Sequence, residues 1–211
     1  MQDFKAVLFD FDGTLADTME DNFLAWKKSF LKYDVNISRK DYFPLEGLTL
    51  SEIAERICKK YSIDPKNSSE IVKFKNEFYI KYNKFRFYPG AESLIRNLKK
   101  NKSLALVSAS PKEKLEKTVP KYFLKSFDVI ISGDDVKHGK PNPEPYLTAI
   151  EVLSLDSRLC IAIENAPLGI KSAKAAGIYC IALTTTLSKE ELMLADKIIS
   201  NFKNLEKVLL G

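Results

Sequence analysis

The sequence lacks several features that would assign it to a specialised class of protein. Its 211 residues include only three cysteines and one histidine, and no pair of cysteines has the spacing of a metal site. No apolar run approaches the ~18 residues that a membrane-spanning helix needs. The N-terminal MQDFKAVLFD has no basic region followed by a signal-length apolar stretch. Internal repeats and low-complexity segments are absent. We therefore expect a cytoplasmic globular protein without a membrane partner.

The cysteines and the charges indicate the setting and the partners. Cys160 and Cys180 lie inside the apolar runs LCIAI and YCIAL, where free thiols behave as small buried hydrophobic groups. This pattern predicts a reduced intracellular setting. The formal net charge is only +5, and the lysines alternate with acidic and apolar residues. Because arginines and aromatic residues form no common cluster, we expect no nucleic-acid partner.

Short, continuous apolar runs recur along the chain without the polar alternation of a half-exposed strand. They lie at 6–9, 104–107, 128–131, 160–163 and 179–183, with a weaker sixth at 197–200. Such runs are typical of parallel strands that are buried on both faces. Segments of helical periodicity separate them from Ala91 onward. The sequence therefore predicts βαβ units and a doubly wound, Rossmann-like α/β core.

Residues 17–86 interrupt this alternation, because they contain no convincing strand. The predicted helices there cover 17–33, 49–61 and 68–85. Asp17 and Glu20 have the spacing of a capping box at the start of the first helix. Pro89 and Gly90 mark the return to the sheet. We therefore expect a helical cap formed by 17–86, inserted into a core formed by 1–16 and 87–211.

Polar side chains follow the buried runs at the points where the strands end. They are Asp10 and Asp12 after the first run, Ser108 and Ala109 after the second, Lys140 in the loop after the third, and Glu164 and Asn165 after the fourth. The carboxyl ends of parallel strands share one edge of a sheet, and ligands bind in the crevice there. We therefore expect these residues to meet in one site, although they are far apart in the sequence.

Asp10 and Asp12 flank Phe11 at an extended strand end, which points both carboxylates to the same side. Two carboxylates that close repel each other, so a cation or a raised pKa is required. Mg²⁺ prefers oxygen ligands and usually binds one or two carboxylates together with a substrate phosphate. For an isolated DxDG motif, a solvated turn is the commoner explanation. The polar residues at the other strand ends favour a metal site.

Ser108 and Lys140 each have a structural as well as a functional interpretation. Ser108 precedes Pro111, which opens a helix whose free N–H groups favour a phosphate; alternatively, Ser108 or Ser110 only caps that helix. Lys140 lies in the proline-rich loop HGKPNPEPY, which either positions its ammonium against phosphate oxygens or leaves it at the surface. His138, isolated in the same loop, is interpreted as an exposed residue rather than a catalyst.

Together, these motifs resemble those of the haloacid dehalogenase superfamily, in the subgroup with a helical cap after the first motif. FDFDGTLADT, SAS, GKPNPEPY and IENAPLGIKSAKAAGI match its four motifs in order. The chain looks closest to the β-phosphoglucomutase-like phosphatases. The resemblance implies a Mg²⁺-dependent phosphatase that acts on small phosphorylated metabolites such as sugar phosphates.

The resemblance also implies a role for each residue of the site. Asp10 is the nucleophile that forms an aspartyl phosphate, and Asp12 is the acid/base. The implied Mg²⁺ ligands are Asp10, the Asp12 carbonyl, Glu164 and Asn165. The groups implied to neutralise the transferring oxygens are Ser108, the Ala109 N–H and Lys140. The cap excludes water when it closes.

Two departures from the family bear on function. An acidic residue is usual at the position of Asn165, so we expect weaker Mg²⁺ binding and predict that Asn165→Asp lowers the Mg²⁺ requirement. The cap His, Lys and Arg of β-phosphoglucomutase correspond to Asn22, Glu46 and Leu50, which favours hydrolysis over the alternative, a hexose-phosphate mutase.

Dehalogenases lack the second aspartate, so Asp12 disfavours that activity. A non-catalytic scaffold is disfavoured because the nucleophile, its acid/base partner and the motif lysine are all present.

The choice of substrate depends on the cap. Gly47, in the loop LEGLTL, can bend toward the site and is the predicted substrate contact in the cap. Lys81, Lys84 and Arg86 meet either a second anionic group or only solvent. For the oligomeric state we expect a monomer.

Overall fold

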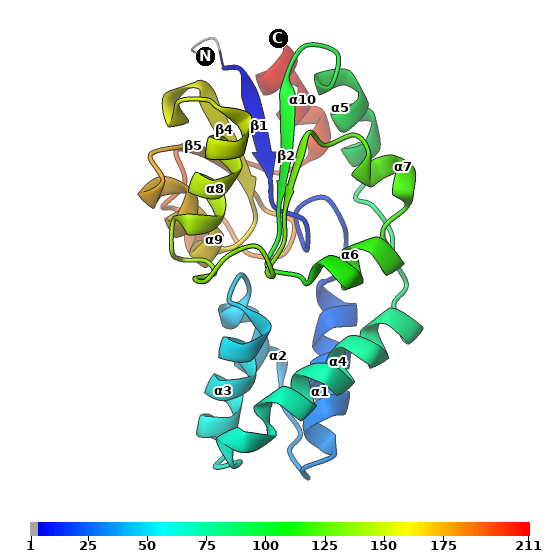
Figure 1. Cartoon of the computed structure of the whole chain (residues 1–211). Coiled ribbons are helices and arrows are strands. Elements are labelled where there is room, and N and C mark those ends of the chain that lie inside the picture. The colour runs from blue at the N-terminus through cyan, green and yellow to red at the C-terminus, as the bar shows by residue number, and fades with distance from the viewer. Residues whose placement is uncertain (1–3) are drawn as a thin grey trace.

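The computed structural model describes residues 4–211. Its core is a six-stranded, all-parallel sheet with the strand order β3-β2-β1-β4-β5-β6 (Figure 1). The strands are β1 (Ala6–Phe9), β2 (Ser103–Val107), β3 (Val129–Ile131), β4 (Cys160–Glu164), β5 (Tyr179–Leu183) and β6 (Lys197–Ile199). Each strand overlaps the apolar run that predicts it. The predicted doubly wound α/β fold is therefore confirmed.

Helices cover both faces of this sheet. One face carries α5 (Ala91–Leu98), α6 (Lys112–Thr118), α7 (Lys121–Leu124) and α10 (Phe202–Leu210), and the other carries α8 (Glu144–Leu153) and α9 (Pro167–Ala175). Side chains alternate along the strands, so Val7 and Phe9 of β1 face the first group of helices and Leu8 faces the second. Cys160 and Cys180 are buried free thiols on the second face, as predicted.

After β1, the chain from Met19 to Tyr82 consists of helices and short connecting loops, and we call this part the cap. It contains α1 (Met19–Leu31), α2 (Arg39–Tyr42), α3 (Leu50–Lys60) and α4 (Ser68–Tyr82), with 3-10 turns at Phe43–Leu45 and Pro65–Asn67. Figure 1 shows these helices as a separate layer facing the carboxyl ends of the strands. Their buried side chains, among them Phe23, Trp26 and Ile57, form a hydrophobic cluster of their own. The cap therefore has its own packed interior.

The start of α1 differs from the prediction. Thr18 precedes the helix as its N-cap residue, and the predicted capping box at Asp17 does not form. The Asp17 carboxylate instead accepts a hydrogen bond from Arg86 at 2.8 Å. This ion pair joins the two chain segments that connect the cap to the core, beside a backbone bridge between Ala16 and Phe87. The spacing of neighbouring residues could not predict this contact, because Arg86 is distant from Asp17 in the sequence.

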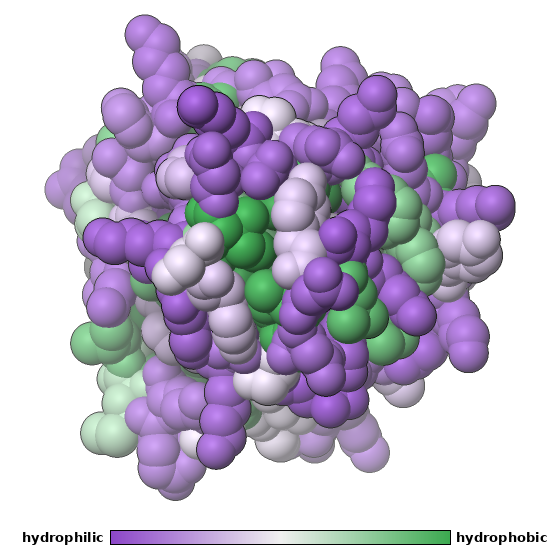
Figure 2. All heavy atoms as spheres, turned by 90° about the horizontal axis from the view of Figure 1, so that it is seen from below, coloured by the Kyte–Doolittle hydropathy of each residue, from purple (hydrophilic) through white to green (hydrophobic). Residues whose placement is uncertain are grey.

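Figure 2 shows the molecule from the cap end, where hydrophilic side chains surround a central strip of apolar ones. None of the helices within residues 4–211 combines the length and the apolar character that crossing a membrane requires.

Candidate active site

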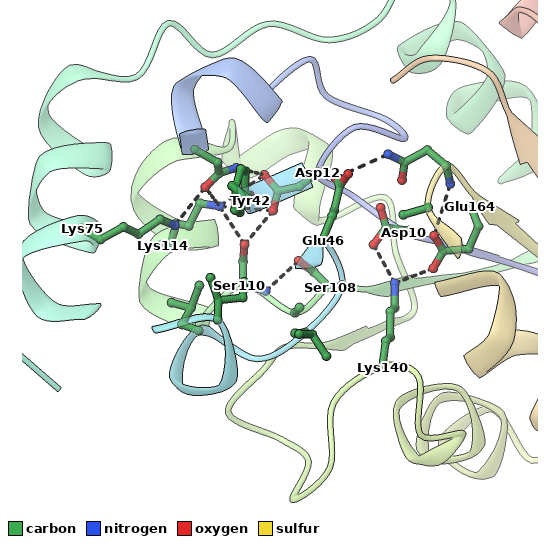
Figure 3. Close-up of a pocket in the computed structure, with 18 residues that line it drawn as sticks. Asp10, Asp12, Tyr42, Glu46, Lys75, Ser108, Ser110, Lys114, Lys140 and Glu164 are labelled. Carbon is green, nitrogen blue, oxygen red and sulfur yellow. Dashed lines mark hydrogen bonds and ion pairs between the residues drawn. The ribbon is translucent and has the colours of Figure 1, made fainter. Parts of the chain in front are cut away.

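A cavity of about 40 Å³ lies where the cap meets the carboxyl edge of the sheet (Figure 3). The residues of the predicted site that line it are Asp10, Asp12, Gly47, Ser108, Ala109, Lys140, Glu164 and Asn165. They meet because β1, β2 and β4 end at the same edge and the loop after β3 returns to it. The structure thus brings together every residue of the predicted site.

Asp10 continues β1, and its carboxylate is held by two donors. Its Oδ1 atom accepts a hydrogen bond from the Lys140 ammonium at 2.6 Å, and its Oδ2 atom accepts one from the Thr14 hydroxyl at 2.9 Å. Burial raises the pKa of Asp10 to about 7; Lys140 opposes this rise, and the nearby Glu164 adds to it. Lys140 is therefore the group that keeps the Asp10 anion accessible near neutral pH.

Lys140 is buried and bridges two carboxylates. Its Nζ atom donates to Asp10 and to Glu164 at 2.6 Å each, and to the Val107 carbonyl at 3.1 Å. These contacts use all three donors of the ammonium. Burial opposes its charge, but the two carboxylates raise the pKa of Lys140 above its ordinary value. Lys140 is therefore not a surface lysine, whereas His138 in the same loop is exposed, as expected.

Asp12 has a lysine of its own, which the sequence analysis missed. Lys114 of α6 lies 3.2 Å from the Asp12 carboxylate, which also accepts hydrogen bonds from Ser110 at 2.7 Å and Thr18 at 2.6 Å. Although burial opposes ionisation, Lys114 and these hydrogen bonds hold the pKa of Asp12 below its usual range. The two aspartates thus coexist because each pairs with a separate lysine and because the pKa of Asp10 is raised. The sequence predicts a cation or a raised pKa here, and the cations in this structure are lysines.

A further buried lysine, Lys75 of α4, lies on the cap side of the cavity. It donates to the Oδ1 atom of Asn22 at 2.9 Å, and Lys114 donates to the same oxygen at 3.2 Å. Burial lowers the pKa of Lys75 well below its ordinary value, and Lys114 adds to this effect. The burial of Lys75 could have been predicted from the sequence, because Lys75 is spaced one helical turn from Ile71 and from Tyr79. All three residues share the buried face of α4.

The cap cations that the sequence analysis considered lie elsewhere. Lys81, Lys84 and Arg86 are exposed, and Arg86 is engaged by Asp17. They do not line the cavity.

Ser108 and Ala109 follow β2. The Ser108 hydroxyl oxygen accepts a hydrogen bond from the Ser110 N–H at 3.1 Å, and no side chain caps α6. The capping interpretation of these serines is therefore wrong. The Lys112 N–H, at the start of α6, is bonded to Asp134, so this one N–H is not available to a phosphate. The Ala109 N–H has no hydrogen-bond partner in the described part of the chain.

Glu164 and Asn165 lie at the end of β4. Glu164 accepts hydrogen bonds from Lys140 and from the Tyr146 hydroxyl at 2.7 Å. The Asn165 Oδ1 atom lies 2.8 Å from the Thr14 hydroxyl oxygen, so Asn165 and Asp10 compete for the one hydrogen of this hydroxyl. Among residues 4–211, no three His, Cys, Asp or Glu side chains already form a metal-binding cluster. The Lys140 ammonium lies between two of the predicted ligands instead.

Glu46 reaches the cavity from the cap, although the sequence analysis considered it only as a replaced mutase residue. It follows the 3-10 turn at Phe43–Leu45, and Gly47 next to it has a φ of +95°. The bend predicted at Gly47 is therefore present. Burial, and then the proximity of Asp10, raise the pKa of Glu46 well above its ordinary value.

Comparison with known proteins places this geometry in a family. The model of the haloacid dehalogenase-like hydrolases matches residues 7–183, which include every residue that lines the cavity. The chain belongs to the haloacid dehalogenase-like hydrolases. This confirms the family that the motifs predict.

Two relatives and one solved structure of this hydrolase family resemble the chain over most of its length. Validoxylamine A 7′-phosphate phosphatase of Streptomyces hygroscopicus subsp. limoneus is 30% identical over 94% of each chain. The β-phosphoglucomutase of Bacillus subtilis is 31% identical over 85% of this chain and 83% of that protein. The crystal structure of CbbY from Rhodobacter sphaeroides in complex with phosphate has a TM-score of 0.81 and 27% identity, with 96% of each chain covered.

Proposed function

We propose that this hydrolase cleaves small phosphate monoesters of the sugar-phosphate type, with Asp10 as covalent nucleophile and Mg²⁺ as cofactor. The observation that carries the proposal is the buried Lys140 ammonium, which lies 2.6 Å from the carboxylates of both Asp10 and Glu164. It places a fixed positive charge beside a candidate nucleophile. The relative that is named as a validoxylamine A 7′-phosphate phosphatase supports the same reaction class.

In the first step Asp10 attacks phosphorus, and the bond between phosphorus and the ester oxygen breaks, which leaves an aspartyl phosphate and an alcohol. Phosphoryl transfer depends mainly on positioning and on charge stabilisation. Lys140, the Ser108 hydroxyl and the unpartnered Ala109 N–H line the cavity at Asp10. They are the groups that can balance negative charge on the transferring oxygens.

In the second step water attacks phosphorus and Asp12 takes its proton, while the bond between phosphorus and the Asp10 oxygen breaks, which releases inorganic phosphate and regenerates the Asp10 carboxylate. Lys114 holds Asp12 ionised in the observed arrangement, which is the state that a base requires. To protonate the leaving alcohol in the first step, Asp12 has to carry a proton itself. This requires its carboxylate to move away from Lys114, Ser110 and Thr18, which stabilise the ionised form. Thr18 leads into the cap, and Lys114 contacts Asn22 of the cap. We therefore link the two protonation states of Asp12 to opening and closing of the cap.

The donor set of the cavity fits Mg²⁺, an ion that prefers oxygen ligands. Asp10, Glu164 and Asn165 offer side-chain oxygens, and Asp12 offers its carbonyl. The Oε2 atom of Glu46 is buried and has no partner. Asp10 and Glu164 share the Lys140 ammonium and Glu46 has no cationic partner in the described part of the chain, so an added cation would relieve the repulsion among these three carboxyl groups. When bound, the ion would polarise the phosphoryl group as a Lewis acid.

Substrate entry requires the cap, which we take as 17–86, to move. The cavity has about 40 Å³ of space for the centres of water molecules, which leaves little room for a phosphate ester while the cap is closed. The bridge between Ala16 and Phe87 lies where both connections meet the core. Rotation about these connections would open the cavity, and closure would exclude water from the reaction.

The cap side of the cavity suits an alcohol with several hydroxyl groups. The Lys75 amine donates one hydrogen bond to Asn22 and can donate others to such groups, whereas the Asn22 amide already donates to Asp12 and to the Thr18 carbonyl. The similarity to β-phosphoglucomutase supports a hexose-phosphate mutase as the second candidate. A mutase returns an isomeric phosphate ester, whereas a phosphatase releases inorganic phosphate, so phosphorus NMR of the products separates the two.

Hydrolysis of p-nitrophenyl phosphate with and without Mg²⁺ tests the proposal. We expect Asp10→Asn to abolish turnover, because an amide is not a nucleophile for this reaction. Asp34→Asn is the matched control: Asp34 is exposed and has a φ of 58°, a conformation that asparagine also tolerates. Equal rates for the wild type and Asp10→Asn would refute the proposal.

A further inference from the structure

Glu46 is a buried carboxyl group without a cationic partner, although it lies among other acidic groups. Its side chain is 7% exposed, and its Oε2 atom has no hydrogen-bond partner. Its Oε1 atom accepts only a long hydrogen bond, 3.4 Å, from the Asn165 amide. Lys140, the buried ammonium on this side of the cavity, donates to other groups. A buried carboxylate without a compensating charge is costly, so this carboxyl group either holds a proton or pairs with a cation that completes the site.

The absence of a side chain at Gly13 leaves room for the Glu46 carboxylate. A Cβ atom on Gly13 would lie 3.0 Å from the Glu46 Oε1 atom and 2.3 Å from the Asn165 Nδ2 atom, so a side chain at Gly13 would displace both. On the cap side, the N–H groups of Glu46 and Leu48 donate to carbonyls three residues earlier, at 3.2 Å each. This tight turn holds Glu46 at its tip, with the carboxylate directed into the cavity (Figure 3).

We propose that Glu46 supplies, from the cap, the negative charge that the neutral Asn165 does not supply to the divalent-ion site. The two side chains are in contact although they are 119 positions apart in the sequence. Because Glu46 belongs to the cap, the site has its full negative charge only while the cap is closed. By reciprocity, a bound ion favours the closed cap. This inference deepens the proposed function and rests on it.

Mg²⁺ binding to the full chain, measured by isothermal titration calorimetry, tests the role of Glu46. Glu46→Gln keeps the shape of the side chain and removes its charge, and we expect it to weaken Mg²⁺ binding about 10-fold or more. Glu55→Gln, an exposed position of α3, makes the same change of charge in the cap. We expect it to alter the affinity by less than about twofold, because exposed charges are screened.

The same Glu46→Gln substitution is then measured in a protein that also carries Asn165→Asp, and this comparison decides the matter. Asn165→Asp restores a carboxylate next to Glu46, so Glu46→Gln should then weaken Mg²⁺ binding by less than about twofold. An unchanged affinity in Glu46→Gln, or an equal loss in both backgrounds, overturns the inference.

Hydrogen exchange of the wild-type protein tests the link to the cap without any substitution. We expect Mg²⁺ to slow exchange at the amides of Glu46 and Leu48; unchanged exchange overturns that link. Wild-type hydrolysis of p-nitrophenyl phosphate is measured in parallel. If the wild type neither binds Mg²⁺ nor turns over, the proposed function itself fails. If it does both and Glu46→Gln binds Mg²⁺ normally, only the role of Glu46 fails.

Discussion

Lys75→Met is expected to stabilise the protein and to lower its activity. The Lys75 side chain is 1% exposed, and its ammonium donates to Asn22. No carboxylate forms an ion pair with it within residues 4–211. Methionine has a similar length and no charge to bury, and Asn22 keeps Lys114 as a donor after the substitution. Activity should fall because the cap side of the cavity loses a hydrogen-bond donor.

The size and the pH dependence of this effect follow from burial. Replacing buried ionic groups with apolar residues of similar volume often stabilises a protein by about 1–4 kcal/mol, and we expect a gain in this range at pH 7. Burial lowers the folded-state pKa of Lys75 below its unfolded value of about 10.4. Between the two pKa values the unfolded chain binds one more proton, so this group makes wild-type stability rise with pH by up to ~1.4 kcal/mol per unit. The advantage of Lys75→Met therefore shrinks as the pH rises.

Urea unfolding at pH 7, 8 and 9 measures both quantities. The chain has one tryptophan, Trp26, which is buried in the cap cluster and reports unfolding by fluorescence. Lys73→Met is the control, because Lys73 is exposed on the same helix. A destabilised Lys75→Met variant at pH 7, or an advantage that is the same at each pH, would refute the reasoning.

Three further predictions concern the core side of the site. Gly169→Ala should inactivate the enzyme in the p-nitrophenyl phosphate assay, because the added Cβ would lie 2.1 Å from the Glu164 carboxylate; a fully active variant would contradict the placement of Glu164. Tyr146→Phe removes a hydroxyl that donates to Glu164 and should cost about 1 kcal/mol in thermal unfolding, with no loss expected for the exposed Tyr122→Phe. Inorganic phosphate should bind more tightly with Mg²⁺ present, by calorimetry; equal affinities would argue against a shared site.

The sheet could be predicted from the sequence because its strands are buried on both faces. A run such as AVLF at Ala6–Phe9 has no polar alternation, and only a parallel sheet covered by helices gives such a run two apolar environments. Helix boundaries depend on finer contacts. The first cap helix starts after Thr18 rather than at Asp17, since the Asp17 carboxylate finds a better partner in the distant Arg86.

The core half of the site could be predicted for the same topological reason. Residues that follow parallel strands, such as Asp10 and Glu164, must share an edge of the sheet. The cap half could not, because helical periodicity identifies the buried face of α4 but not what that face meets. Lys75 lies on this face between apolar residues. Only the packing of α4 on α1 reveals its contact with Asn22, and only the docking of the cap brings both near Lys114.

The charges around the cavity explain why the cap matters for the chemistry. Four carboxyl groups and three amines line it: Asp10, Asp12, Glu46, Glu164, Lys75, Lys114 and Lys140. A divalent ion and a phosphate dianion carry opposite charges, so binding them together leaves this balance unchanged, whereas binding either alone shifts it by two charges in a medium of low dielectric constant. The cap contributes one acidic and one basic group, Glu46 beside Asn165 and Lys75 near Lys114. Burial disfavours the charged form of both groups, so closing the cap adds no net charge. It places a carboxyl group where the ion is expected and an amine on the opposite side, where the alcohol would lie.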